Sequence, residues 1–376
     1  TNVDSVGIIT ARSGLISLVD STINGLTIGE GGNSVATNTV LGASAFASNT
    51  TGTHNVAIGA NALDANTTAN HNVAVGSRSL GANTTGGQNI AAGFEALKVN
   101  TTGAQNTAVG HAALQANTTA DNNTAMGYAA LAANTTGTDN VAVGSGALDA
   151  NTTASENVAV GKDALTDNTT GTSNTAVGRM ALGNNTTANG NTAVGTDALF
   201  TNTTGAENTA LGHSAMFANT TGSSNVAVGS AALDANTTAV ENTAIGRNAL
   251  GSTTTGGYNT AVGSGSLSSN TTGVKNVAVG RDALINNTTA DNNTGVGYHA
   301  LQVNSTGDNN TAVGALALDA NTTGVSLVAI GYGALGANTT ASQNVAVGQN
   351  ALAANTTGAN NTALGLDALV SNTTTG

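Results

Sequence analysis

The chain contains no cysteine, no proline and no tryptophan, and only 2% of its 376 residues are aromatic and 7% charged. Without cysteine there can be no disulfide framework and no thiolate metal site, and the redox compartment cannot be inferred. An average globular domain has about 25% charged residues, so this is not the composition of an ordinary globular core. Disordered chains usually combine much proline with high net charge. Because Val, Ile and Thr recur regularly here, we predict an ordered repeat instead.

The charge is acidic and scattered, with a net value of −12, a pI near 4.4 and no run of either sign. We therefore expect no nucleic-acid partner. No apolar stretch approaches the roughly 18 residues of a membrane span, and the N-terminus lacks the regions of a signal peptide, so we expect no membrane insertion. The chain begins at Thr1 and stops one residue short of a complete repeat, which suggests a window of a longer polypeptide.

What the sequence does contain is one 17-residue unit written twenty times between Asn38 and Gly376. In the copy NVAIGANALDANTTANH, residues 55–71, the column of Gly59 is Gly in every copy. The column of Leu63 is Leu except at Phe46 and Met216. The Val56 column is always β-branched, the Ile58 column is always apolar, and the triplet that starts at Asn66 returns as NTT. The positions of Ala60, Asn70 and His71 accept every kind of side chain, which indicates a solvent-facing surface.

One unit has only three sizeable apolar side chains, Val56, Ile58 and Leu63, too few to stabilise an isolated fold. Stacked units can bury these columns against their neighbours. We therefore predict an all-β protein, a parallel β-solenoid or β-roll of twenty 17-residue coils over residues 38–376. Residues 55–58 are predicted to form a strand that buries Val56 and Ile58 on one face and directs Ala57 to the other.

The remaining columns predict corners and a cap. An invariant Gly59 indicates a positive φ or a close backbone approach. Asn66 suits a second corner, since Asn tolerates the left-handed region and its amide can form a ladder along stacked coils. Residues 60–65 are compatible with a second strand or a single helical turn, and we favour the strand. Residues 1–37 do not obey the period, and we predict that they form a connector or cap over the first coil.

The NVAVG and NTAVG strings resemble the SVAIG-type repeats of trimeric autotransporter adhesin heads, which form left-handed parallel β-rolls in homotrimers. The pattern NTAVG-xx-AL-xx-NTTG resembles more closely the repeats of bacteriophage tail-fibre and fibre-like proteins, and VDSVGIITARSG resembles a linker of cyanophage structural proteins. These resemblances imply a trimeric extracellular or virion fibre, with any host-surface or glycan receptor bound by parts outside this window. Three chains could pack along the columns of Ala57 or Ala62.

No catalytic, cofactor or metal site is predicted. The five histidines lie in variable columns, at His54, His71, His111, His213 and His299. A catalytic histidine needs an orienting partner held in a pocket, which these positions do not suggest. Four aspartates share one column but are five coils apart, about 24 Å, too far for joint metal binding unless trimer symmetry gathers three copies of one of them. They are Asp64, Asp149, Asp234 and Asp319.

The NTT triplets are formal N-glycosylation sequons, for example at Asn66, Asn83 and Asn100. A structural asparagine ladder is the simpler interpretation of these triplets. Stacked rows of Thr67 or Thr68 would also space hydroxyl and methyl groups regularly, as an ice- or crystal-binding surface requires.

From the sequence we therefore expect a non-catalytic structural fibre segment without a cofactor, either a phage tail fibre or an extracellular adhesive shaft, built as a homotrimer or self-assembled fibre. Two alternatives stay open. One is an extracellular fibril that polymerises end to end through exposed strand edges. The other is the threonine-rich ice- or crystal-binding solenoid.

Overall fold

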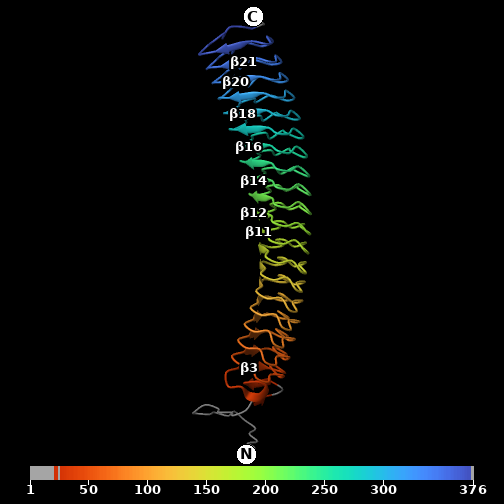
Figure 1. Cartoon of the computed structure of the whole chain (residues 1–376). Coiled ribbons are helices and arrows are strands. Elements are labelled where there is room, and N and C mark those ends of the chain that lie inside the picture. Colours follow the sequence, from red (N-terminus) through yellow and green to blue (C-terminus); the bar gives the residue numbers. More distant parts are fainter. Residues whose placement is uncertain (1–20, 24–25, 374–376) are drawn as a thin grey trace, which may run out of the picture. The chain divides into compact units, whose positions relative to one another are not determined.

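A computed structural model describes residues 21–23 and 26–373, and within them the secondary structure is β-strand and turn apart from one short 3-10 helix (Figure 1). The chain divides after Asn122 into two units, and each is a stack of short parallel strands joined by turns. The predicted all-β parallel β-solenoid with a 17-residue repeat is confirmed, with about 19 coils in all.

The first unit begins with three antiparallel strands. Strand β2 (Leu26–Gly29) pairs with β1 (Ser21–Ile23) on one side and with β3 (Thr39–Gly42) on the other, and the 3-10 helix η1 (Gly32–Ser34) connects β2 to β3. The edge of β3 is thus covered by a strand from the segment predicted to be a cap. Residues 1–20 and 24–25 of that segment lie outside the described residues. Four parallel strands follow: β4 (Val56–Ile58), β5 (Val73–Val75), β6 (Ile90–Ala92) and β7 (Thr107–Val109).

The second unit contains fifteen parallel strands of three residues each. They are β8 (Thr124–Met126), β9 (Val141–Val143), β10 (Val158–Val160), β11 (Thr175–Val177), β12 (Thr192–Val194), β13 (Thr209–Leu211), β14 (Val226–Val228), β15 (Thr243–Ile245), β16 (Thr260–Val262), β17 (Val277–Val279), β18 (Thr294–Val296), β19 (Thr311–Val313), β20 (Val328–Ile330), β21 (Val345–Val347) and β22 (Thr362–Leu364). Figure 1 shows them lying one beside the next in chain order.

Register is constant along each stack, because every strand residue lies opposite the residue 17 positions further along the chain. Val158 pairs with Thr175, for example, and Val160 pairs with Val177. The coils are also joined beside the strands, as where the amide of Val158 donates to the carbonyl of Asn174 at 2.8 Å. Matching columns therefore lie directly over one another, as the repeat predicted.

The prediction that Val56 and Ile58 are buried is wrong. In each strand the central residue points inward, and Ala57 is fully buried, whereas Val56 and Ile58 are only half-buried. Side chains alternate along a strand, so burying the alanine column places both larger columns outside. The interior is narrow, and the Ala57 column faces a wall that already contains the fully buried Ala62 and Leu63 columns. Only a small side chain fits opposite that wall.

Two further predictions are corrected by the same geometry. Residues 60–65 form turns rather than a second strand, because Asn61 and Leu63 have left-handed φ values of 55° and 51°. The Ala57 and Ala62 columns cannot be a contact between chains, since both are fully buried within their own coil. Asn66 is not itself left-handed; the left-handed residue at the other corner is His71, with φ 61°.

The invariant glycine is explained as predicted. Gly59 has φ +133°, and a Cβ at this position would lie 2.6 Å from the carbonyl carbon of Gly76 in the next coil. A left-handed backbone and a close approach thus coincide at one position.

Two ladders of buried asparagines run through the interior. In the predicted one, Asn83 Nδ2 donates to Asn66 Oδ1 at 3.2 Å and to the carbonyl of Gly86 at 2.9 Å. The second ladder, in the column of Asn55, was not predicted. There the amide of Asn72 donates to Asn55 Oδ1 at 2.9 Å, and Asn55 Nδ2 donates to the carbonyl of Ala69 at 2.9 Å. Buried corner amides and carbonyls are thereby satisfied by side chains.

Candidate functional site

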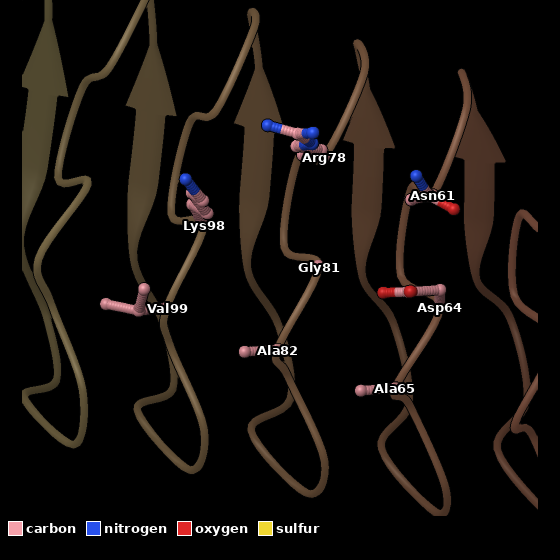
Figure 2. Close-up of a pocket in the computed structure, with 8 residues that line it drawn as sticks. All are labelled: Asn61, Asp64, Ala65, Arg78, Gly81, Ala82, Lys98 and Val99. Atoms are coloured by element: carbon pink, nitrogen blue, oxygen red, sulfur yellow. The ribbon is translucent and has the colours of Figure 1, made fainter.

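A hollow on the first unit lies where a glycine interrupts a column of longer side chains. Gly81 lies between Asp64 in the preceding coil and Lys98 in the following one, and the hollow has a volume of about 410 Å³. Figure 2 shows the Asp64 carboxylate extending toward the coil that contains Gly81, with Arg78 at the upper rim. The lining contains a carboxylate and two cations but no hydroxyl or imidazole. It can hold water or a small polar group.

The cations at the rim belong to an ion-pair network around Glu95. Glu95 Oε1 accepts from Arg78 Nη1 and from Lys98 Nζ, both at 3.0 Å, and Oε2 accepts from Gln115 Nε2 at 2.6 Å. The hydrogen bond from Lys98, with those from Arg78 and Gln115, holds the pKa of Glu95 below its usual value. The network joins three successive coils through one carboxylate. Both cations are therefore engaged by the protein itself.

The aspartate column shows what the missing side chain does. Partial burial raises the pKa of Asp64, Asp234 and Asp319, and each is followed one coil later by a glycine whose Cβ would lie 3.5 Å from the carboxylate. These glycines are Gly81, Gly251 and Gly336. The fourth aspartate, Asp149, is followed instead by Thr166, whose hydroxyl donates to Asp149 Oδ1 at 2.8 Å. The hollow thus recurs with the glycine, and at Gly251 its volume is about 320 Å³.

Replacing Gly81 by threonine is expected to lower the pKa of Asp64, because the new hydroxyl can donate to the carboxylate as Thr166 does. A raised carboxyl pKa means that the folded state binds the proton more tightly, so stability is lost as pH rises through that pKa. The variant should therefore be more stable than the parent at neutral pH and nearly equal at low pH. An NMR titration of the Asp64 carboxyl and thermal melts at both pH values measure this. Gly81→Ala is the control, and an equal shift in both variants would contradict the explanation.

The histidines form ring contacts rather than a site. The rings of His54 and His71 stack with centroids 5.1 Å apart and an interplanar angle of 8°. His111 stacks on Phe94 and His299 on Tyr298. His299 Nε2 also lies 3.5 Å from Asp282 Oδ2. Coil stacking places equal columns at ring-stacking distance, which explains the contacts of His54 with His71 and of His111 with Phe94, whereas Tyr298 and His299 are neighbours in the sequence.

The NTT triplet could carry glycans on its asparagines or present its threonines as a surface row. The side chains of Asn66, Asn83 and Asn100 are fully buried in the ladder, so a glycan cannot be attached to them in the folded protein. The hydroxyl of Thr67 donates to the carbonyl of Thr84 at 3.1 Å, and this bond recurs along the column. The Thr67 row is therefore occupied by contacts between coils, while the Thr68 row is exposed.

In each unit, aliphatic and threonine side chains form a surface on the outside of the strands. We call the two outward columns of each strand, represented by Val226 and Val228 in β14, the strand face. These columns contain only Val, Ile, Leu, Met, Ala and Thr. Exposed fractions in the second column include 46% at Leu211 and 40% at Ile245 and Ile330. Sequence reasoning missed this face because both columns looked like core.

No protein-family model matches the chain, and no curated protein matches it. The expectation of a fibre protein therefore depends on the repeat and the fold described above.

Within residues 21–23 and 26–373 no group of three or more His, Asp or Glu side chains is close enough to hold a metal ion. Over the same described part of the chain, no helix has the length and apolar character needed to span a membrane.

Proposed function

We propose that the chain is a structural segment of a fibre, a shaft that provides length and lateral surface without catalysis. The observation that carries this proposal is the uniformity of the stack. From β8 to β22, each described pair of strands has the same register, and equal side chains repeat the same ladder bonds in coil after coil. A fold in which each coil contacts only its neighbours makes extension, rather than a pocket, its distinguishing property.

The shaft is proposed to belong to an extracellular or virion fibre, of the tail-fibre or adhesive type that the NTAVG and NTTG strings resemble, and to assemble as a homotrimer. The strand face supports lateral assembly, because it leaves a long apolar surface outside each coil. In such a fibre the receptor, whether a host surface or a glycan, is bound by other parts of the polypeptide.

Electron microscopy of the purified chain tests the shaft, and we expect straight particles of one length. With coils about 4.8 Å apart, the fifteen strands of the second unit alone account for roughly 67 Å. Indefinite filaments would favour the end-to-end polymer instead, and flexible beads would refute the shaft. Sedimentation measures the assembly, where a trimer has three times the 36.1 kDa mass of one chain. A stable monomer would refute the homotrimer. Thermal hysteresis of the same sample tests the ice-binding alternative.

A further inference from the structure

We propose that the strand face is the surface through which this chain binds a second copy of itself, in parallel orientation and with equal coils opposite one another. This rests on the proposed fibre function, to which it adds the partner, the contact surface and the direction of the chains. The proposed contact surface lies on the second unit, β8 to β22.

The strand face has no strongly hydrated side chain, although nine of the fifteen residues in its first column are threonines. Its first column alternates irregularly between Thr and Val, as at Thr209, Val226 and Thr243, and its second contains mainly Val, Leu and Ile. No charged or amide side chain occurs in either column of the fifteen strands. Both columns remain partly exposed in the single chain, so water contacts a continuous apolar stripe.

The area of the stripe is close to that of a stable interface. Fifteen strands about 4.8 Å apart span roughly 67 Å, and two outward columns with their side chains are about 10 Å wide, which gives about 700 Å². A standard protein–protein interface buries about 800 Å² on each partner. A second copy of the chain provides a stripe of the same length and composition.

The two edges of the strand face differ in their charged side chains. The residue after each strand's glycine forms the trailing edge, whose cations in this unit are Lys162, Arg179, Arg247 and Arg281, with His213 and no carboxylate. The residue before each strand's asparagine forms the leading edge, whose carboxylates are Asp139, Glu156, Glu207 and Glu241, with Lys275 as its one cation. The face is therefore acidic at one edge. At the other edge Lys162, Arg179 and Arg281 are paired with Asp163, Asp197 and Asp282 of their own chain, whereas Arg247 has no such partner among the described residues.

This asymmetry distinguishes the two directions in which copies can pair. When copies are related by rotation about an axis along the stack, the leading edge of one meets the trailing edge of the next, so the carboxylates of one copy face an edge with cations and not another row of carboxylates. When one copy is turned end over end, leading meets leading and trailing meets trailing, and like charges face each other. Opposite charges across an interface favour one orientation and disfavour the other. The parallel arrangement follows, for two copies or for three.

Charges also match when the same coil of each copy lies opposite, because several strands are flanked by an acidic residue on one side and a basic residue on the other. Glu156 and Lys162 flank one strand, Glu241 and Arg247 flank another, and Glu207 and His213 flank a third. Lys275 and Arg281 form the one like-charged pair, but Arg281 Nε contacts Asp282 Oδ2 of its own chain at 3.0 Å. Lys162 likewise contacts Asp163. Glu241 and Arg247 form no ion pair within the described chain, so they report the contact between copies most directly.

The first test removes the apolar contact. Ile245→Lys combined with Val279→Lys places two charges on the strand face at positions 40% and 36% exposed. The matched control is Thr255→Lys with Thr289→Lys, at exposed sites of the same repeats away from the face. Sedimentation equilibrium of the full chain should show association weakened at least 100-fold by the first pair and less than threefold by the control. Equal circular dichroism and melting temperature show that both variants fold.

The second test measures direction. Because the chain has no cysteine, Ser145→Cys and Gln349→Cys each create one labelling site, both on the trailing edge and twelve coils apart, about 58 Å. With nitroxide labels on each variant in turn, parallel copies give the same short interchain distance at both sites. Antiparallel copies cannot do so, since a short distance at one site forces a long one at the other. Glu241→Lys should weaken association about 3- to 10-fold, and Glu241→Lys with Arg247→Glu should restore it.

The outcomes separate the two proposals. Association that survives both face lysines would overturn the strand face while leaving a fibre assembled through another surface. Long distances at both labels, or a short distance at one label and a long one at the other, would overturn the parallel direction. A wild-type chain that stays monomeric would overturn this inference, and electron microscopy would then still decide whether the monomer is a shaft.

Discussion

Replacing Gly212 by alanine is expected to unfold the coils around it. The new Cβ would lie 2.6 Å from both the carbonyl carbon and the carbonyl oxygen of Gly229 in the next coil, and φ at this position is +138°. Neither backbone can move away, because Gly229 makes the same approach to Gly246 beyond it. Left-handed strain and overpacking together should cost about 3–5 kcal/mol locally. Each coil contacts only its neighbours, so the loss is concentrated at β13 and β14 (Thr209–Leu211 and Val226–Val228).

Native-state hydrogen exchange checks this, because it resolves local opening that a single melting curve of a repeat array does not. Amides of the coils at Gly212 and Gly229 should lose most of their protection, while those near β21 (Val345–Val347) should keep theirs. Gly251→Ala is the matched control. Its Cβ meets nothing closer than 3.3 Å, and its column accepts residues as different as Asp234 and Phe217. Equal loss of protection in both variants would show that the close approach at Gly212 is not the cause.

The period, the register and the invariant glycine could all be predicted from the sequence, because stacking forces equal positions to meet. Inside and outside could not be assigned correctly, since the strand contains apolar residues on both faces. Val56 and Ile58 are larger than Ala57 and looked like core, yet the coil is too narrow to enclose them. The range of side-chain sizes in each column could have shown which column points inward. The inward column departs from Ala only at Val40 and Gly295, whereas the outward column varies from Ala92 to Met126.

Of the two buried asparagine ladders, one was predicted from the sequence. The asparagine ladder at Asn66 followed from the NTT triplet, but the ladder at Asn55 was overlooked, although its column is Asn in every copy except at Leu327. Position alone does not say that an asparagine is buried, because Asn is usually a surface or turn residue. What decides it is that one corner carbonyl per coil accepts hydrogen bonds from both ladders, as the carbonyl of Gly86 does from Asn83 and Asn72. That requirement becomes visible only when the coil is closed.

Replacing Thr253 by asparagine is expected to stabilise the second unit by about 1–3 kcal/mol, because it repairs a gap in the ladder. Each ladder asparagine donates to the one before it, as Asn219 Nδ2 does to Asn202 Oδ1 at 2.8 Å. Thr253 interrupts this order and leaves Asn236 Oδ1 buried without a hydrogen-bond partner. It also offers Asn270 Nδ2 only a long 3.4 Å contact to its hydroxyl. An asparagine at this position provides the missing donor and a better acceptor in a space that every other described coil fills with asparagine.

The reverse substitution at an equivalent ladder position, Asn202→Thr, tests the same hydrogen bonds. Asn202→Thr should remove the 2.9 Å bond to Asn185 Oδ1, create the same buried unpaired oxygen one coil earlier, and cost a similar 1–3 kcal/mol. Hydrogen exchange in the coils on either side should slow in Thr253→Asn and accelerate in Asn202→Thr. If both variants changed protection in the same direction, side-chain size rather than hydrogen bonding would control the ladder. Opposite shifts of similar size would show that each rung contributes through its bond to the next, which is the property that allows such a stack to be extended coil by coil.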